Sequence, residues 1–496
     1  MLQHVKRLAV TAAILLSAAQ AGAQSGYVQA VPIDPANIDR SANACVDFNA
    51  FANGGWIKRT AIPAAFSRWG SFDELGERNQ AALQTILADI TNPMGRKLSM
   101  NERLVADYYS SCMDSARAEL DGPAPLMAIL RPIDAIANRN QLQSQLARLH
   151  AQGVAAVFGF SAVQDAKNSE SVIGGASQGG LSLPSRDYYL ENSPRFVGLR
   201  TEFVAHVQRM LGLTGVRPAA AAAQAQRILA LETAFARASM SNVELRDPVK
   251  TYNRRTPAQL ATLTPHFDWA HYFTDLGASR VPAVDVQNPK FMQAFDSLLV
   301  AVPLADWKAY LRWRAIKSYA GNLNAAFVNE NFAFDSKLSG AKEQLPRLKR
   351  CTRAADAGLR DGLGRIYVEK NFTPQAKARA LEMINHLADV YRERINSLAW
   401  MSPDTRKQAL LKLNTYVRKI GYPDVWRDYS ALNIRRGSYL PNRIAAARYE
   451  NRRDLAQIGK PVNRADWGMT TPTVNAYYNP AMNEIVFPAG IMQPPF

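Results

Sequence analysis

The sequence predicts a mainly helical protein with a β-containing segment near its C-terminal end. Residues 76–420 carry helical periodicity, with apolar positions three and four residues apart between capping signals. Two stretches break this pattern, residues 154–183 and residues 473–487, and both are rich in β-formers and turn residues. We therefore expect several packed helical hairpins followed by strands of a small sheet.

The N-terminal residues predict export from the cytoplasm. A short basic head precedes an apolar core, Leu8 to Ala19, and the small-x-small cleavage site Ala21-Gly22-Ala23. The apolar run is shorter than the ~20 residues that span a bilayer, which favours a cleaved signal peptide over a membrane anchor. We expect residues 1–23 to be removed, leaving a periplasmic or secreted protein without a transmembrane segment.

One helix is predicted to start at Thr373-Pro374, where an N-cap residue precedes a proline at the first helical position. Its apolar residues recur at helical spacing and share one face, which we expect to be buried: Met383, Leu387, Val390, Tyr391, Ile395 and Leu398. The alanine-rich segment from Pro218 to Ala238 is typical of a helix for the same reasons.

A second helix is predicted to begin at Ser402-Pro403 and to run to residue 420. Its apolar stripe consists of Leu410, Leu413, Val417 and Ile420. Gly421, with Pro423 just beyond, is expected to end this helix, because glycine is favoured after a helix and proline cannot continue one. Helix therefore follows helix with a short connection.

The first break is predicted to be a small strand or loop between helices, and the second to contain two strands. Residues 154–183 combine an apolar β-rich run with two glycine pairs, which are too loosely spaced for a phosphate-binding loop. Near the C-terminal end, Thr473 to Tyr478 and Glu484 to Phe487 are predicted as two strands around a turn. An isolated hairpin is marginal in water, so we expect the sheet to which they belong to be incomplete.

Composition and charge exclude some classes of protein. Hydrophobic residues make up 47% and charged residues 20% of the 496 residues, which is typical of a globular protein. The formal net charge is +17, but Lys and Arg are interleaved with Asp and Glu, and the densest basic runs are short. We therefore expect no nucleic-acid partner, and a weaker attraction to anionic surfaces or acidic peptides is the alternative.

No complete catalytic set is recognisable in the sequence. Among its six histidines only His266 and His271 are close together, and neither belongs to H-E-x-x-H, whose spacing turns both imidazoles toward one zinc ion. A G-x-S-x-G nucleophile motif is absent, and Cys112 has no neighbouring histidine. We therefore predict no catalytic residue and no metal site in this chain.

A series of short motifs keeps its order along almost the whole mature chain. The motifs are Cys45-Val-Asp-Phe48, Gly54-Gly55-Trp56, Ile62-Pro63, Tyr109-Ser-Ser-Cys-Met-Asp114, Gly180-Leu-Ser-Leu-Pro-Ser-Arg-Asp-Tyr-Tyr189, Arg246-Asp247-Pro248, Tyr252-Asn253, Tyr367-Val-Glu-Lys370, Trp400-Met401, Ile420-Gly-Tyr-Pro-Asp424, Val474-Asn-Ala-Tyr-Tyr478, Asn483-Glu-Ile-Val-Phe-Pro-Ala-Gly490 and Gln493-Pro-Pro-Phe496. Each motif is weak, but the ordered series resembles the neprilysin and endothelin-converting-enzyme family of zinc metalloendopeptidases.

The resemblance implies a domain organisation. A large helical cap domain, residues 76–420, would cover a thermolysin-like catalytic domain, and substrate would enter a chamber between them. Residues 24–75 would pack on the catalytic domain, and residues 421–496 would form the N-terminal, β-containing part of that domain. The family's zinc helix follows soon after the Pro-Pro-Phe segment, so the chain resembles a member truncated before its zinc motif.

The resemblance also implies roles for individual residues. In the family, the Asn-Ala-Tyr-Tyr segment is an edge strand that binds the substrate backbone, and we carry this role to Asn475 and Ala476. Arg68 matches an arginine that meets the far end of the substrate, where a guanidinium can bind a carboxylate bidentately. A second family arginine would fall at Gly76, which puts recognition of a C-terminal carboxylate in doubt. The alternative readings are an ordinary strand before a turn and a solvated surface arginine.

The three cysteines also have counterparts in the family. Cys112 and Cys351 match a disulfide pair within the helical domain. Cys45 matches a cysteine whose partner lies near the C-terminus of the full-length enzyme, so it is expected to be unpaired here. Asn53 stands where many relatives have another cysteine.

These observations lead to two functional hypotheses. The first is the N-terminal portion of an exported zinc metalloendopeptidase that cleaves oligopeptides. Without the zinc ligands and the catalytic glutamate, this chain alone would bind no zinc and be inactive. The second is a non-catalytic peptide-binding or regulatory protein derived from the family. Neither hypothesis predicts the oligomeric state.

Overall fold

The structure is a computed structural model that describes residues 34–278 and 280–494. The predicted signal peptide lies outside these described residues. The chain divides into two compact units, residues 34–61 with 493–494 and residues 62–492. Within the described residues, no helix combines the length and the apolar character that crossing a membrane requires.

The N-terminal unit contains the 3-10 helix η1 (Pro35–Asn37) and the helix α2 (Phe48–Arg59). Gly55 lets these two elements approach closely, because a Cβ atom there would lie 2.2 Å from the carbonyl oxygen of Ala36. This contact gives the Gly54-Gly55 motif of the sequence a packing role.

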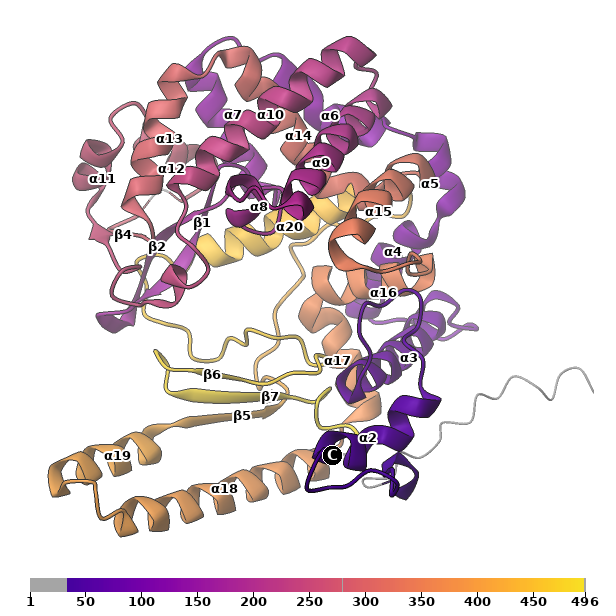
Figure 1. Ribbon diagram of the computed structural model, residues 1–496, viewed down its shortest axis with the longest axis vertical. Coiled ribbons are helices and arrows are strands. Elements are labelled where there is room, and N and C mark those ends of the chain that lie inside the picture. The colour runs from indigo at the N-terminus through magenta and orange to yellow at the C-terminus, as the bar shows by residue number, and fades with distance from the viewer. Residues whose placement is uncertain (1–33, 279, 495–496) are drawn as a thin grey trace, which may run out of the picture. The chain divides into compact units, whose positions relative to one another are not determined.

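The larger unit, residues 62–492, is mainly helical, as the sequence predicts (Figure 1). Its α-helices are α3 (Ser71–Thr91), α4 (Met100–Met113), α5 (Ser115–Asp121), α6 (Ala124–Asp134), α7 (Arg139–Ala151), α8 (Asp187–Leu190), α9 (Pro194–Leu213), α10 (Pro218–Ala238), α11 (Pro257–Leu263), α12 (Trp269–Leu276), α13 (Pro289–Ala301), α14 (Leu304–Tyr319), α15 (Ala325–Ser339), α16 (Arg347–Gly358), α17 (Arg360–Asn371), α18 (Pro374–Ser397), α19 (Pro403–Thr415) and α20 (Tyr439–Leu455). Two further 3-10 turns are η2 (Glu244–Arg246) and η3 (Ala320–Asn322).

The predicted helix starts are confirmed. The Thr373 side chain caps α18 by accepting a hydrogen bond from the Ala376 N–H at 3.2 Å. Ser402 caps α19 in the same way, accepting from the Thr405 N–H at 3.2 Å. Helix α10 begins at Pro218 and ends at Ala238, as its sequence indicates.

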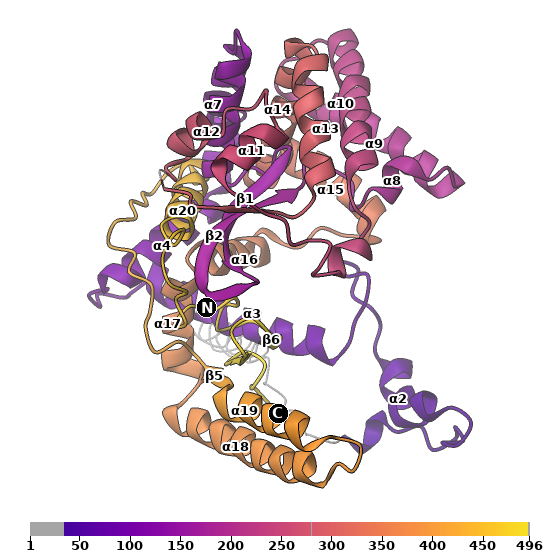
Figure 2. The same cartoon turned by 90° about the vertical axis from the view of Figure 1, so that its left-hand side faces the viewer.

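A four-stranded sheet forms at the first break in the helical pattern, in the order β1-β2-β4-β3. The strands are β1 (Phe158–Asp165), β2 (Asn168–Gln178), β3 (Arg254–Arg255) and β4 (Val284–Val286). Figure 2 shows the long β1–β2 hairpin, at a place where the sequence predicts only a small strand or loop between helices. The short strands β3 and β4 are not predicted from the sequence. A strand of two or three residues is too short to show an alternation of apolar and polar positions.

The largest hydrophobic core joins this sheet to the surrounding helices α6, α7, α9, α10 and α12–α14. Phe158 lies at its aromatic centre, with ring centroids 5.8 Å from Phe267, 5.5 Å from Trp269 and 5.5 Å from Tyr272. Such tilted and edge-on contacts are the favoured geometries of aromatic pairs.

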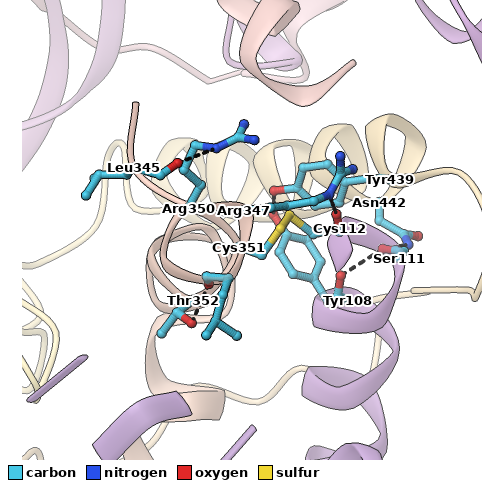
Figure 3. Close-up of a disulfide and its surroundings, with 11 residues drawn as sticks. Tyr108, Ser111, Cys112, Leu345, Arg347, Arg350, Cys351, Thr352, Tyr439 and Asn442 are labelled. Atoms are coloured by element: carbon cyan, nitrogen blue, oxygen red, sulfur yellow. Dashed lines mark hydrogen bonds between the residues drawn. A yellow bond between two sulfur atoms is a disulfide. The ribbon is translucent and has the colours of Figure 1, made fainter. Parts of the chain in front are cut away.

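The second core packs α3, α4, α16, α17 and α20 together and contains the disulfide between Cys112 and Cys351 (Figure 3). This is the pair that the family resemblance implies. The Arg347 guanidinium donates to the Cys112 carbonyl oxygen at 2.8 Å, and Asn442 donates to Ser111 at 2.9 Å. Covalent and polar contacts therefore connect α4, α16 and α20.

The C-terminal sheet has three strands rather than two. They are β5 (Val417–Gly421), β6 (Tyr477–Asn479) and β7 (Glu484–Pro488). The prediction that α19 continues to residue 420 is wrong: the helix ends at Thr415, and Val417–Gly421 pairs in parallel with β7. Val417 and Ile420 fit a helical stripe by spacing alone, but as β-branched residues they are equally suited to a strand.

The prediction of a buried apolar face on α18 is also wrong for most of its residues. Met383, Leu387, Val390 and Tyr391 are exposed. The buried residues of α18 are instead Ala380, Ile384 and Ala388, and the first two pack against Ile420 of the sheet. The helix is amphipathic as predicted, but the sheet covers only a narrow part of its apolar side.

Candidate functional site

The C-terminal sheet has an open edge at β6. Strand β7 lies in the middle, parallel to β5 and antiparallel to β6. Tyr477 is opposite Val486 and Asn479 is opposite Glu484. Among the described residues, no further strand pairs with the outer side of β6. An edge of this kind offers backbone N–H and C=O groups to an extended chain.

Asn475 and Ala476 lie directly before β6 and not within it. The prediction that the strand begins at Thr473 is wrong, because the ladder includes only Tyr477–Asn479. The Thr473 N–H donates to the Thr470 carbonyl oxygen at 3.1 Å and so closes a turn in place of a strand pair. The Ala476 N–H donates to the Asn475 Oδ1 at 2.8 Å, and Asn475 is exposed.

Asn79, on the buried face of α3, holds the segment that leads to Asn475. Its Nδ2 donates to the carbonyl oxygens of Pro472 at 3.1 Å and Gly490 at 2.9 Å. Its Oδ1 accepts from the Tyr367 hydroxyl at 3.1 Å. Because Asn79 is only 5% exposed, these bonds are shielded from water and costly to leave unmade. One amide thus joins α3, α17 and the two segments that flank the β6–β7 hairpin.

Gly490 allows these two segments to touch. Its N–H donates to the Thr471 carbonyl oxygen at 2.8 Å, and a Cβ atom at this position would lie 2.2 Å from the Pro472 carbonyl oxygen. Any side chain would therefore force the two segments apart. The glycine of the Asn483–Gly490 motif has a packing role beside the candidate site.

Further contacts fix the residues that precede Asn475. The Arg360 guanidinium donates to the carbonyl oxygens of Trp467 at 3.3 Å and Gly468 at 2.8 Å. The Gly468 N–H donates in turn to the Tyr477 hydroxyl at 2.9 Å. The irregular chain before β6 is therefore connected both to α17 and to the strand that follows it.

A buried ion pair lies between the two parallel strands. Lys419 of β5 meets Glu484 of β7 with 2.7 Å between Nζ and Oε2, and their side chains are only 8% and 2% exposed. The Lys419 ammonium also donates to the Asp466 carbonyl oxygen at 2.8 Å. The charged pair therefore ties both strands to the irregular segment.

Asp356 of α16 lies beneath the same segment. Its Oδ2 accepts from the Thr470 hydroxyl at 3.1 Å, while its buried Oδ1 has no hydrogen-bond partner within the described chain. Burial raises the pKa of Asp356 to about 6, although Thr470 and Arg360 pull it in the opposite direction. The folded chain therefore retains a proton on Asp356 at a pH where an exposed carboxyl is ionised.

Replacement of Asp356 by Asn is expected to change the pH dependence of stability. Well below pH 3.8 the carboxyl is protonated in both the folded and unfolded chains. As pH rises from the ordinary value of 3.8 to about 6, only the unfolded chain releases the proton, so the parent protein loses stability. Urea unfolding measures the free energy of unfolding of both proteins. The value for Asp356→Asn minus the value for the parent should rise by about 2 kcal/mol between pH 4 and pH 8.

A matched control is Asp389→Asn, because the Asp389 side chain is 62% exposed on α18. Because this side chain is exposed, the substitution should change the free energy of unfolding by less than about 0.5 kcal/mol. A pH-independent difference for Asp356→Asn would show that this carboxyl titrates normally.

Arg68 lies in the loop before α3 and is exposed. The loop is held at Ala64, whose carbonyl oxygen accepts from the N–H groups of Lys342 at 2.8 Å and Glu343 at 3.1 Å. The structure shows no hydrogen bond or ion pair between Arg68 and any described residue. At Gly76, where a second family arginine would fall, a Cβ atom would point into open space, with nothing beyond its own helix within 4 Å.

The described residues do not fit a zinc ion. No group of three or more His, Cys, Asp or Glu side chains in residues 34–278 and 280–494 converges in a way that could hold a metal. The histidines make structural contacts instead: His206 pairs with Glu330 at 2.7 Å, and His266 with Asp296 at 2.8 Å. The absence of bound zinc stays a prediction.

Sequence reasoning missed the residues that support the site. Asn79 occupies a helical stripe otherwise made of leucine and isoleucine, and a lone amide in such a stripe could have identified it. Lys419 and Glu484 are separated by 65 positions, and nothing local indicates that they pair. Cys45 is exposed and has no disulfide partner within the described residues.

The sequence profile of Peptidase family M13 matches residues 44–423. Endothelin-converting enzyme 1 of Homo sapiens is 31% identical over 485 residues, a match that covers 93% of this chain and 62% of that protein. Neprilysin-3 of Drosophila melanogaster is 28% identical over 488 residues, with the same coverage of both chains. The chain therefore spans less than two thirds of the length of these curated relatives.

Solved structures of other proteins also resemble this chain. The zinc metalloprotease ZMP1 of Mycobacterium tuberculosis in complex with inhibitor is 36% identical, with a TM-score of 0.88, over 95% of this chain and 71% of that chain. PepO from Lactobacillus rhamnosis shares the fold at a TM-score of 0.82 and 22% identity. On the family match, the identity to endothelin-converting enzyme 1 and the shared fold, this chain belongs to Peptidase family M13.

Proposed function

We propose that this chain supplies the peptide-binding part of an exported zinc metalloendopeptidase that acts on oligopeptides. The observation that carries the proposal is the exposed Asn475, placed directly before the open edge strand β6. Membership of a peptidase family supports the reaction class. Export rests on the predicted signal peptide, residues 1–23.

An extended oligopeptide would add to the edge of the sheet beside β6. Main-chain hydrogen bonds would supply affinity with little dependence on sequence, and the Asn475 amide would add polar contacts. Arg68 has no partner among the described residues and would receive a carboxylate of the peptide. Zinc and its ligands would come from the part of the family's polypeptide that this chain does not include, where the metal would activate water for hydrolysis.

Peptide binding by the purified chain tests this proposal. We expect Asn475→Ala to weaken binding of a fluorescent octapeptide about tenfold, equivalent to about 1.4 kcal/mol, because side-chain hydrogen bonds to the peptide are lost. Fluorescence anisotropy measures the affinity, and Asn396→Ala on the exposed surface of α18 is the matched control. Arg68→Ala should weaken binding of a peptide with a free C-terminal carboxylate but not of its amide.

The proposal fails if the parent chain binds no peptide at millimolar concentration. It also fails if Asn475→Ala and Asn396→Ala bind equally well, because binding would then occur elsewhere.

A further inference from the structure

The tip of the β1–β2 hairpin contacts the β6–β7 turn, residues 480–483. Gln164 of β1 makes this contact with its side-chain amide. Its Nε2 donates to the Ser169 carbonyl oxygen at 2.5 Å, within the hairpin, and to the Ala481 carbonyl oxygen at 3.1 Å, in the turn. One amide therefore connects two segments that are 317 positions apart in the sequence.

Arg464 makes a second connection between the same two parts. Its Nη1 donates to the Met482 carbonyl oxygen at 3.1 Å, and its Nη2 donates to the Glu170 Oε1 of the hairpin at 2.8 Å. The side chains of Arg464 and Glu170 are 44% and 72% exposed, so the ion pair alone contributes little stability. Two successive carbonyl oxygens of the β6–β7 turn nevertheless accept hydrogen bonds from side chains outside the C-terminal sheet.

Asp165, the residue after Gln164, fixes the hairpin tip. It is only 5% exposed, and its Oδ1 accepts from the Tyr252 hydroxyl at 2.7 Å and from the Lys167 N–H at 3.0 Å. The Arg254 Nε lies 3.2 Å from its Oδ2. A buried carboxylate with this many partners restricts the backbone that carries it. Tyr252, which belongs to one of the ordered sequence motifs, therefore helps to hold Gln164 in place.

The chain that follows α20 also runs along the hairpin. Residues 459–462 pair with residues 170–172 through three backbone hydrogen bonds of 2.8–3.1 Å. Arg464 comes two residues later and returns to the hairpin through its side chain. The hairpin thus holds the start of the irregular segment that leads to β6 and, through Gln164, the turn at the other end of β6.

The last residue of the turn is held from the opposite side, by α19. Asn483 has a φ of 48°, in the left-handed region that asparagine tolerates. Its Nδ2 donates to the Lys412 carbonyl oxygen at 2.9 Å and to the Thr415 Oγ1 at 3.2 Å. Its Oδ1 accepts from the Tyr478 hydroxyl at 3.1 Å. The turn is therefore held between α19 and the β1–β2 hairpin.

Strand β6 depends on this turn for its direction. It has only three residues, Tyr477–Asn479, and among the described residues it pairs with β7 alone. We propose that Gln164 is a positioning residue for the peptide-binding edge: together with Arg464 it forms a clasp on the β6–β7 turn, which keeps β6 in the direction that an added peptide strand requires. The inference rests on the proposed function, because β6 is the edge that would receive the peptide.

Gln164→Glu tests the clasp. Glutamate has nearly the same shape, but at neutral pH it donates no hydrogen bond, and its charge would face the carbonyl oxygens of Ser169 and Ala481. Affinity for an acetylated and amidated octapeptide without ionisable side chains should fall about tenfold at pH 7. At about pH 4 the protonated side chain donates again, and affinity should return to within about threefold of the parent. Fluorescence anisotropy with a rhodamine-labelled peptide measures all four affinities.

Gln344→Glu is the matched control. The Gln344 Nε2 also donates to a backbone carbonyl oxygen, that of Val328 at 3.3 Å, but not in the C-terminal sheet. Its affinity for the peptide should stay within about twofold of the parent at both pH values. Urea unfolding of Gln164→Glu should change the free energy of unfolding by no more than about 1 kcal/mol, because one exposed hydrogen bond is lost. Recovery in acid is the result that a general loss of stability would not produce.

Three results would overturn the clasp. Gln164→Glu could bind the peptide as the parent does at pH 7, its weaker binding could persist at pH 4, or Gln344→Glu could weaken binding equally. In each case the parent still binds peptide, so the proposed function stands.

Failure of the parent to bind peptide would reject the proposed function, and hydrogen exchange then decides the clasp. At pH 7 the amides of residues 477–483 should exchange at least threefold faster in Gln164→Glu than in the parent, and no faster in Gln344→Glu. Equal exchange in Gln164→Glu and the parent would reject the clasp as well.

Discussion

Removal of the Cys112–Cys351 disulfide is expected to lower the free energy of unfolding by about 5 kcal/mol. The two cysteines are separated by 239 positions. The bond closes a very long loop and so removes much of the entropy of the unfolded chain. Urea unfolding of the oxidised parent and of the double variant Cys112→Ser, Cys351→Ser measures the difference.

The third cysteine supplies the control. Cys45 is exposed and belongs to the N-terminal unit, so Cys45→Ser should change stability by less than about 0.5 kcal/mol. A loss below about 1 kcal/mol in the double variant would mean that the unfolded chain gains little freedom when the bond is absent. Residual structure in the unfolded chain would then be the physical reason.

Lys419→Met is expected to lower the free energy of unfolding by about 3–5 kcal/mol. The substitution leaves Glu484, which is 2% exposed, as a buried charge without its partner. It also removes the hydrogen bond to the Asp466 carbonyl oxygen. Because both strands of the parallel pair are affected, we expect the loss of stability to be accompanied by weaker peptide binding beside β6.

A surface ion pair provides the matched control for this substitution. Lys370 and Asp89 approach to 2.6 Å, but their side chains are 45% and 52% exposed. Lys370→Met should therefore cost no more than about 1 kcal/mol. Adding Glu484→Leu to Lys419→Met should recover much of the lost stability, because an apolar pair needs no charge compensation. Failure of this recovery would show that the cost comes from packing and not from the uncompensated charge.

Local signals in the sequence predicted the helices well. Capping residues followed by proline, as at Thr373 and Ser402, determine a helix start by bonds within a few residues of each other. The β1–β2 hairpin is also formed by segments that are adjacent in sequence, although the sequence predicted only a small strand or loop there. The formation of these features depends mainly on contacts between residues that are close in sequence.

The errors occurred where distant residues decide the structure. Val417–Gly421 becomes a strand because β7, more than sixty residues later, pairs with it. The exposure of Leu387 and Val390 depends on how far the sheet extends under α18, which no periodicity reveals. A stripe of apolar residues predicts that a face prefers to be covered, but it does not specify which polypeptide covers it.

The candidate site was predicted in part. The ordered motifs located Asn475, Ala476 and Arg68, and the structure places the first two directly before an edge strand. The strand boundary was wrong because Asn79 and Thr470 draw the preceding residues into a turn. The roles of all three residues in binding stay predictions.

The irregular segment between α20 and β6 has a further consequence for binding energetics. Asn79, Arg360 and Lys419 each hold one or more of its carbonyl oxygens, so this stretch loses its conformational freedom when the protein folds. A ligand that docks beside it would not have to order the protein again. The entropic cost of association would then fall mainly on the ligand, and short or conformationally restricted ligands would gain most from the preorganised edge.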